Sequence, residues 1–330
     1  MRLESLEGLA SFALLAPGYD GPGWTLLRDL APVSPRGRGA RLVFAGFEDP
    51  AGRARVFAAR RVETVRPALG PDPGPLRTRL DARGHAAKVR RIRAAIARGD
   101  VYQVCLCASA RLGPATGAEI LRRFCRRGAP RFAAWARLPG GPEFVSASPE
   151  LFFTVDGDRA RVEPMKGTAA PGALAELRRS AKDRAELAMI TDLLRNDLTP
   201  VCRPRTVRVA AARRFLRLPY AVQAVSDVRG RLKPGAGPLE VLAALHPGGS
   251  VVGAPKRAAL TMIRALEPRP RGAYCGALGL ARGPRATFSL LIRTAQRGAS
   301  DWVYGVGGGV VWGSRPVAER RELDVKLGAL

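Results

Sequence analysis

The chain has 330 residues, 46% of them hydrophobic, which is enough to bury a substantial core as one large domain or two smaller ones. Its formal net charge of +27 raises the question of nucleic-acid binding, but the arginines are scattered through every segment, without a basic tail or a recognition motif. These features exclude a collagen-like or disordered chain and argue against nucleic-acid binding as the main function, whereas an anionic small substrate suits the charge.

The N-terminal residues and the cysteines indicate where the protein works. The first residues, MRLESLEG, carry two glutamates and do not resemble a signal peptide. No segment has the roughly 18 consecutive apolar residues of a membrane span. The five cysteines lack CxxC spacing, and Cys105 and Cys107 alternate within an apolar run, which predicts buried free thiols on a strand. We expect a soluble, cytoplasmic protein with no membrane partner.

Residues 1–80 predict a weakly marked α+β region. Short strands are expected at residues 42–47 and 55–59, and the proline-rich run at residues 67–75 is the candidate linker. This divides the chain into a short N-terminal region, residues 1–80, and a larger region, residues 81–330.

The pattern of apolar residues is clearer after residue 80. An apolar stripe every three to four residues predicts helices, and alternation or short apolar runs between Gly and Pro predict strands. The expected helices are residues 85–98, 119–126, 176–197, 239–245, 255–266 and 317–330. The expected strands are residues 101–112, 131–138, 143–146, 151–156, 159–163, 216–228, 274–281, 286–295 and 302–311. Adjacent pairs of strands with helices between them predict an α+β fold with largely antiparallel sheets.

The hexapeptide EPMKGT, residues 163–168, places Lys166 in a predicted turn. Only six of the 55 basic Lys and Arg residues are lysines, so a lysine at this position is notable. A lysine amine can lose its proton and act as a nucleophile, which a guanidinium effectively cannot do. From the hexapeptide alone, a surface lysine in a Pro-Gly turn is an equally good interpretation.

Two predicted helices carry carboxylates spaced three residues apart, which puts each pair on one helix face. The pairs are Asp183 with Glu186, and Glu319 with Glu322. Carboxylate oxygens from two helices suit a hard cation such as Mg²⁺. The alternative for each pair is a solvated helix face whose ion pairs contribute little.

Two glycine-rich segments permit close approach of a ligand to the backbone. Residues 247–256, PGGSVVGAPK, precede a predicted helix and could bind a carboxylate or phosphate, although they match neither a P-loop nor a dinucleotide fingerprint. The run at residues 305–309 follows a strand and permits close approach or simply a bend. Tyr274 and Arg293 are expected on strands, where they could bind a carboxylate.

Eight motifs, in order, resemble the chorismate-utilising enzymes, the family of anthranilate synthase component I and aminodeoxychorismate synthase component I. They are GDVYQV (residues 99–104), ASPELF (147–152), EPMKGT (163–168), KDRAELAMITDLLRNDL (182–198), PGGSVVGAPK (247–256), RGAYCGALG (271–279), IRTA (292–295) and GGGVV with its trailing ExxE (307–322). The resemblance implies two largely antiparallel β-sheets packed as a sandwich with helices outside, to which residues 1–80 contribute, and a chorismate-binding catalytic domain at residues 81–330.

Two positions point to one branch of this family. Members that add water to chorismate carry a lysine where this chain has Gln103, so the resemblance argues against an isochorismate or salicylate synthase. Anthranilate synthases usually have a small residue where this chain has Lys166, and aminodeoxychorismate synthases have lysine. The implied reaction converts chorismate and ammonia to 4-amino-4-deoxychorismate for p-aminobenzoate and folate. The alternatives are anthranilate synthase component I, an aminating enzyme of specialised metabolism, and a non-catalytic chorismate-binding protein.

The resemblance also assigns roles to individual residues. Lys166 is the expected nucleophile and Glu150 the expected proton donor. Mg²⁺ is expected at Glu186 and Glu322, with Asp183 and Glu319 in support. The positions that match substrate-binding residues are Gln103, Gly249, Ser250, Tyr274, Arg293, Gly307, Gly309 and Lys326. Ammonia is expected from a separate glutamine amidotransferase subunit, because nothing in the chain resembles a glutaminase.

Overall fold

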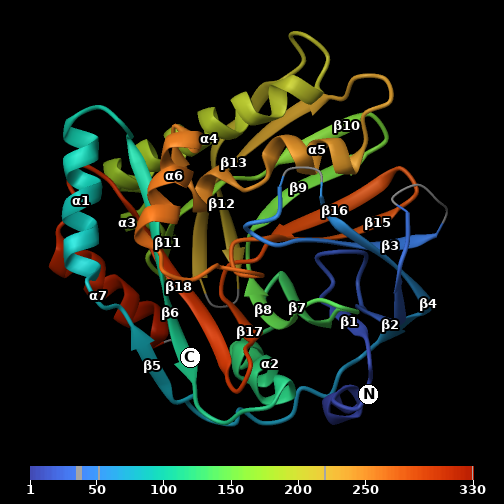
Figure 1. Ribbon diagram of the computed structural model, residues 1–330. Helices are drawn as coiled ribbons and strands as arrows, with labels where there is room; N and C mark the ends of the chain where they lie inside the picture. Colours follow the sequence, from blue (N-terminus) through green and yellow to red (C-terminus); the bar gives the residue numbers. More distant parts are fainter. Residues whose placement is uncertain (35–38, 51–52, 219–220, 329) are drawn as a thin grey trace.

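The computed structural model describes residues 1–34, 39–50, 53–218, 221–328 and 330, and its α+β arrangement is shown in Figure 1. Within these residues the strands join into one 18-stranded sheet. The pairings between its strands are antiparallel. The predicted α+β class with antiparallel pairing is confirmed, and the two expected sheets are joined to each other by continuous hydrogen bonding.

The N-terminal strands are built into the same sheet as the later ones. They are β1 (Phe12–Leu15), β2 (Trp24–Pro32), β3 (Ala40–Ala45), β4 (Arg55–Val65) and β5 (Thr78–Asp81), preceded by the 3₁₀ turn η1 (Leu3–Leu6). Strand β1 pairs with β7, β3 with β15 and β5 with β6. The expected strands at residues 42–47 and 55–59 correspond to β3 and β4. The boundary at residue 80 stays a prediction.

The remaining strands include the hairpins expected from the sequence. They are β6 (Gln103–Leu112), β7 (Phe132–Arg137), β8 (Glu143–Ser148), β9 (Leu151–Asp156), β10 (Arg159–Val162), β11 (Met165–Ala169), β12 (Arg208–Leu218), β13 (Ala221–Arg231), β14 (Gly253–Ala254), β15 (Ala277–Arg282), β16 (Arg285–Leu290), β17 (Thr294–Arg297) and β18 (Trp302–Val310). The hairpins β7–β8 and β9–β10 form as predicted.

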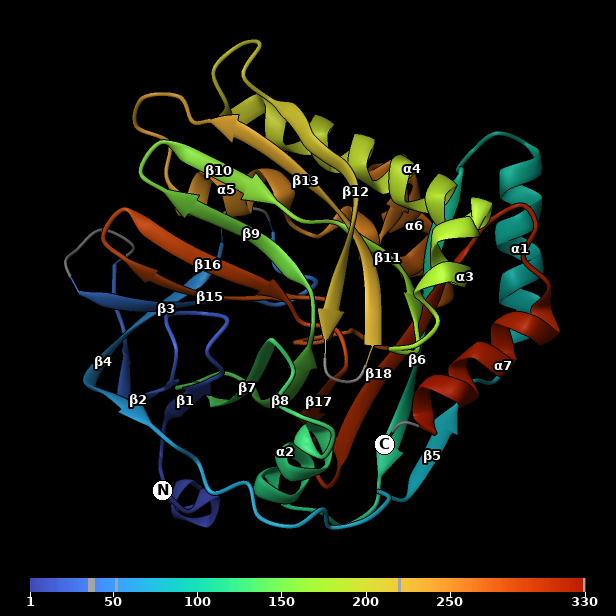
Figure 2. The same ribbon diagram turned by 180° about the vertical axis from the view of Figure 1, so that it is seen from behind.

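Helices cover the outside of the sheet. They are α1 (His85–Ala97), α2 (Gly117–Cys125), α3 (Leu174–Arg179), α4 (Ala181–Leu198), α5 (Pro238–Leu245), α6 (Lys256–Leu266) and α7 (Pro316–Leu327), with 3₁₀ turns η2 (Thr199–Val201) and η3 (Gly249–Val251). Both views show α1 and α7 side by side at one edge, and α4 along the side of the β12–β13 hairpin (Figures 1 and 2).

Three sequence predictions of local structure were wrong. The helix expected over residues 176–197 is two helices, α3 and α4, because the backbone is extended at Ser180. The strand expected over residues 286–295 is interrupted between β16 and β17, and Arg293 lies in that link. Tyr274 lies in a turn before β15 rather than on a strand. By contrast, the prediction that residues 216–228 are strand-rich is confirmed by the end of β12 and much of β13, and residues 219–220 lie outside the described residues.

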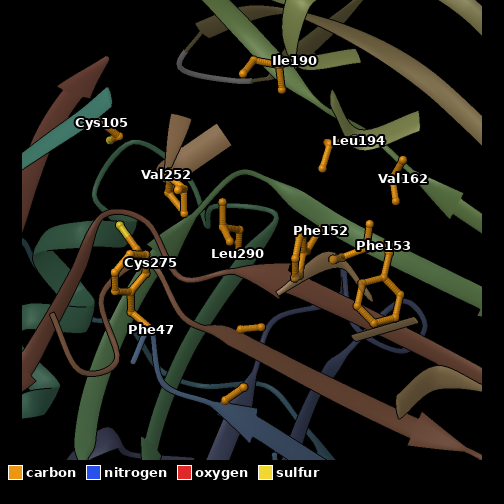
Figure 3. Packing of buried hydrophobic residues seen from close by; sticks show 14 of the residues in the cluster. Phe47, Cys105, Phe152, Phe153, Val162, Ile190, Leu194, Val252, Cys275 and Leu290 are labelled. Carbon is orange, nitrogen blue, oxygen red and sulfur yellow. The ribbon is translucent and has the colours of Figure 1, made fainter. Parts of the chain in front are cut away.

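The largest hydrophobic cluster packs the helices onto the sheet. Figure 3 shows Ile190 and Leu194 of α4 near Val162 of β10, above the aromatic pair Phe152 and Phe153 of β9. The ring of Phe153 stacks on Phe288 with centroids 4.3 Å apart. Burial of such side chains is the main stabilising contribution to a fold of this size.

Strands β10 and β11 pair with β13 one after the other, and the pairing is interrupted between them. Val162 lies opposite Val228 and Met165 opposite Val225, so the register is unchanged across the interruption at residues 163–164. Pro164 has no N–H, and its carbonyl accepts a hydrogen bond from Ser226 N at 3.0 Å. After Met165 the register shifts by one residue.

Ser180 is expected to stabilise the split between α3 and α4. Its hydroxyl accepts a hydrogen bond from Asp183 N at 3.1 Å and so caps α4. Replacing an N-cap serine by alanine typically costs about 1 kcal/mol. We predict that Ser180→Ala lowers the free energy of unfolding by about that amount in a urea titration. Ser300→Ala removes an exposed serine that begins no helix, and an equal loss in both variants would contradict the capping role.

Candidate active site

Lys166 lies in a β-bulge rather than in the turn predicted from the hexapeptide. Thr168 pairs opposite Gln223, so Lys166 and Gly167 together face the single residue Ala224. Gly167 has φ +82°, and a Cβ there would lie 2.9 Å from both Asp183 and Leu177. Only glycine fits this close packing of α3 and α4 on the strand. Bulges redirect side chains beside active sites, and the half-buried Lys166 is in such a position.

Glu150 lies directly before β9 and is buried close to Lys166. Its Oε1 accepts a hydrogen bond from Ser250 Oγ at 3.1 Å, and its backbone N–H donates to Ser148 Oγ at 3.2 Å. Burial raises the pKa of Glu150 to about 7, although the charge of Lys166 and the bond from Ser250 act in the opposite direction. Near neutral pH this carboxyl therefore carries a proton in part of the molecules.

The glycine-rich segment at residues 247–256 brings Gly249 and Ser250 close to Glu150. Gly249 and Ser250 lie in η3, where Gly249 packs against Leu193 of α4 so closely that a Cβ would lie 2.5 Å from it. Arg271 holds the segment in place by donating to Val251 O at 2.7 Å and to Cys105 O of β6 at 2.8 Å. A single buried guanidinium thus joins the glycine loop to the sheet.

Strands β6 and β18 carry three of the six remaining predicted substrate-binding residues, namely Gln103, Gly307 and Gly309. Gln103 is buried at the start of β6, and a Cβ on Gly309 would lie 2.7 Å from its amide nitrogen. Gly305 similarly admits the ring of Tyr274, to which a Cβ would come within 2.1 Å. The charge of Lys166 acts on Cys105, which shows that β6 lies near the bulge.

The predicted thiols Cys105 and Cys107 are buried and free, as expected. Their sulfur atoms are 3.9 Å apart on the same side of β6. The hydrogen bond with Cys107, together with burial, raises the pKa of Cys105 well above its usual value. Burial likewise raises the pKa of Cys107, although its bond with Cys105 acts in the opposite direction, so neither thiol is an activated nucleophile.

Arg293 is exposed and has φ +52°, an unusual backbone conformation for arginine. Its carbonyl accepts a hydrogen bond from Ala147 N at 2.9 Å, three residues before Glu150. Its exposed side chain is available for an anionic ligand.

The acidic pairs of α4 and α7 lie toward the same end of the sheet. A Cβ on Gly308 would lie 3.3 Å from Glu319 Oε2 and 3.4 Å from Glu322 Oε1, so these two carboxylates converge on β18. Lysines balance the acidic charge: Lys326 Nζ contacts Glu322 Oε1 at 2.7 Å and Gly307 O at 2.6 Å. Lys182 of α4 lies 3.8 Å from Glu186.

Only two of the four predicted metal-binding carboxylates lie close enough together to share a cation. Burial raises the pKa of Glu319 and the neighbouring Glu322 charge raises it further, although a hydrogen bond with Ser314 and the charge of Lys326 act in the opposite direction. In the described part of the chain, however, no three acidic, His or Cys side chains converge closely enough to hold a metal ion. A cation could therefore be held at Glu319 and Glu322, whereas Asp183 and Glu186 would have to approach it.

The sequence did not single out two buried charged groups beside the site. Glu163 is fully buried, with arginines around its carboxylate. Glu267 pairs with Arg271 at 2.6 Å and accepts a hydrogen bond from Cys107 N at 2.9 Å. Glu163 begins the motif EPMKGT, but two of its arginine partners, Arg131 and Arg214, are distant in sequence, so only the fold reveals them. Glu267 lies four residues before Arg271, outside the motifs.

The profile of the family described as chorismate binding enzyme matches residues 48–330. The chain belongs to this family. It is 36% identical over 290 residues to anthranilate synthase component 1 of Haloarcula marismortui, covering 84% of this chain and 58% of the relative. It is 38% identical over 252 residues to an aminodeoxychorismate synthase of Streptomyces pristinaespiralis, covering 72% of this chain and 34% of the relative.

The fold has a close counterpart among solved structures. The menaquinone-specific isochorismate synthase of Escherichia coli superposes with a TM-score of 0.82 at 19% identity, covering 98% of this chain and 90% of that one. At this identity the similarity shows the fold alone. The chain spans about a third to three fifths of the length of the two curated relatives described above.

These findings confirm the family and fold predicted from the eight motifs. The chain belongs to the family of chorismate binding enzymes, and the curated relatives described above are named anthranilate synthase component 1 and aminodeoxychorismate synthase. Among the described residues, no helix is long and apolar enough to span a membrane. The roles of the individual site residues, the bound cation and the absence of a nucleic-acid partner stay predictions.

Glu150 should make stability depend on pH. Its pKa is raised in the folded protein, so its contribution to stability is complete below the unfolded value of about 4.5 and is lost as pH rises through about 7. We predict that Glu150→Gln, which is always neutral, loses less stability than the wild type between pH 5 and pH 8, by on the order of 2 kcal/mol. Urea unfolding at both pH values measures this, and parallel curves would contradict the raised pKa.

Proposed function

We propose that the protein is the chorismate-converting component of an aminodeoxychorismate synthase, which makes 4-amino-4-deoxychorismate from chorismate and ammonia. The observation that supports this most is the pairing of a lysine in a strand bulge with a buried carboxyl whose pKa is raised to about 7. The first group can supply a nucleophile and the second a proton, the two requirements for replacing a ring hydroxyl.

In the proposed first step, the neutral amine of Lys166 attacks C2 of chorismate. The C2–N bond forms, the two ring double bonds shift toward C4, and the C4–O bond breaks. Glu150 donates its proton to the departing hydroxyl, which leaves as water, since hydroxide alone is a poor leaving group. Ser250, bonded to Glu150 Oε1, fixes the orientation of the carboxyl.

In the second step, ammonia adds at C4 and the double bonds shift back. The C2–N bond to Lys166 breaks, the amine is regenerated, and the proton released by the incoming ammonia can return to Glu150. The net change is exchange of hydroxyl for amine, with water as the other product. Gln103, at the place where water-adding relatives carry lysine, offers no base to activate water.

The substrate's two carboxylates require positive charge. The exposed Arg293 and the backbone N–H groups at Gly307 and Gly309 are suited to bind them. Mg²⁺, held by Glu186 and Glu322 with Asp183 and Glu319 in support, would supply further positive charge for the ring carboxylate when bound. Lys326, which now contacts Glu322 and Gly307, is placed to exchange these contacts for the substrate.

Ammonia is proposed to come from a separate glutamine amidotransferase. The alternative function is anthranilate synthase component I, supported by the relative from Haloarcula marismortui at a similar identity. An assay with chorismate, Mg²⁺ and a high ammonium concentration separates the candidates by product. Aminodeoxychorismate supports the proposal; anthranilate, isochorismate or no turnover would each contradict it.

Lys166 provides the sharpest test of the mechanism. We predict that Lys166→Ala and Lys166→Arg both lower the rate of aminodeoxychorismate formation by at least about a hundredfold, because a guanidinium keeps the charge but is no nucleophile. Product formation is measured by chromatography. Lys233→Arg, an exposed lysine bonded to Pro200 O, is the control and should retain activity. Wild-type turnover in Lys166→Arg would exclude the covalent step.

The acidic pairs should determine the response to Mg²⁺. We predict that Glu186→Gln together with Glu322→Gln raises the Mg²⁺ concentration needed for half-maximal activity by about tenfold or more, because two oxygen ligands lose their charge. Glu176→Gln, an exposed carboxylate on α3, is the matched control. If the double variant showed the same Mg²⁺ dependence as the control, the proposed cation site would be wrong.

A further inference from the structure

Lys256 joins the two ends of the glycine-rich segment at residues 247–256. It is the last residue of that segment and the first of α6. Its ammonium donates a hydrogen bond to Leu245 O at 3.1 Å, two residues before the segment begins. The same nitrogen lies 2.7 Å from Asp197 Oδ2 in the last turn of α4. One side chain therefore closes the loop and attaches it to a helix.

The ion pair between Lys256 and Asp197 is largely shielded from water. The two side chains expose 19% and 17% of their surface, so their attraction is screened less than that of a surface pair. Burial raises the pKa of Asp197, and the charge of Lys256 opposes that shift. Lysine suits this position because both acceptors meet at one nitrogen, whereas the donors of a guanidinium are spread in a plane. Lys256 is one of only six lysines among the 55 basic residues.

Asp197 also borders the part of the loop that reaches Glu150. A Cβ on Gly249 would lie 3.7 Å from Asp197 Oδ2 and 2.5 Å from Leu193, so η3 packs directly on α4. The next residue, Ser250, donates from its hydroxyl to Glu150 Oε1 at 3.1 Å. The ion pair thus lies beside the residue that precedes this hydroxyl.

The other half of the loop has separate attachments. Strand β14 pairs with the start of β6, and Arg271 donates to Val251 O at 2.7 Å. These contacts fix residues 251–254 on the sheet. The half that carries Ser250 lies against α4, on the side of the ion pair between Lys256 and Asp197.

We propose that Lys256 and Asp197 are positioning residues that hold Ser250 against Glu150 and so orient the carboxyl that donates the proton. Both act through the loop rather than on the substrate. The inference rests on the proposed function, because it gives the loop a part in proton donation. Loss of the pair should slow the chemical step more than it weakens chorismate binding, since the groups proposed to bind the carboxylates lie on other segments.

Hydrogen exchange followed by mass spectrometry tests the attachment of the loop without any turnover. Lys256→Met keeps the length of the side chain and removes its charge. We expect the peptide covering residues 246–256 to exchange about fivefold faster or more in this variant. Peptides of β1 and β2, which pack in other hydrophobic clusters than the loop, should keep their wild-type rates.

Two further variants calibrate this measurement. Asp197→Asn should accelerate exchange less than Lys256→Met, because the hydrogen bond to Leu245 O remains. Lys233→Met is the matched control: Lys233 also donates to a backbone carbonyl, that of Pro200 at 2.7 Å, but is exposed and distant in sequence from the loop. It should leave exchange at residues 246–256 unchanged.

Turnover tests whether the pair acts through Ser250. In Lys256→Met we expect kcat for aminodeoxychorismate formation to fall by about tenfold, with KM for chorismate changed by less than about threefold. Ser250→Ala should lower kcat similarly. Adding Lys256→Met to Ser250→Ala should lower it little further, because both changes remove the same interaction. A residue that only stabilises the fold would multiply the effect of Ser250→Ala.

The two measurements separate this inference from the proposed function. If Lys256→Met accelerates exchange at residues 246–256 alone, but the wild type makes no aminodeoxychorismate, the proposed function fails and the attachment of the loop by the pair stands. If exchange rises equally throughout the chain, or the effects of Lys256→Met and Ser250→Ala multiply, the inference is overturned. Unchanged exchange in Lys256→Met would overturn it as well.

Discussion

The structure depends on the way one strand is placed along β13. The chain runs in register from β10 past Glu163 to Met165, and then inserts one extra residue at Lys166 and Gly167. Because the side chains of a strand alternate, one extra residue changes the face to which the next side chains point. Helices α3 and α4 can pack on this bulge only because Gly167 has no side chain. The position of the reactive lysine is thus set by backbone geometry as much as by its own contacts.

Burial acts differently on two enclosed carboxyls near this bulge, those of Glu163 and Glu150. Glu163 is fully enclosed but meets three guanidinium groups, so its charge is retained inside the protein. Glu150 is also enclosed, but its protein partner is the hydroxyl of Ser250, and its proton is retained instead. The partners of each acid thus decide whether burial keeps a charge, as at Glu163, or a proton, as at Glu150.

The sequence predicted the family, the α+β class and the motifs that carry Glu150 and Lys166, because each of these can be recognised from short stretches of sequence. It predicted the hairpins β7–β8 and β9–β10 for the same reason. It placed Lys166 in a turn, since Pro and Gly flank it, and only pairing with β13 shows a bulge. It also missed the partners of Glu163, because Arg131 and Arg214 lie 32 and 51 residues away along the chain. Pairing at such distances is decided by the assembled sheet.

The contacts of Lys326 affect how a cation could bind at the carboxylates of α7. Its ammonium lies between Glu322 Oε1 and Gly307 O, so the chain supplies its own counter-ion to this carboxylate. A divalent cation that binds Glu322 would then have to displace the Lys326 ammonium from the carboxylate, which makes its binding an ion exchange. Because Lys326 competes for the same carboxylate, the apparent affinity for the cation is lower than it would be without the lysine. Binding of the cation also releases Lys326 beside the glycines of β18.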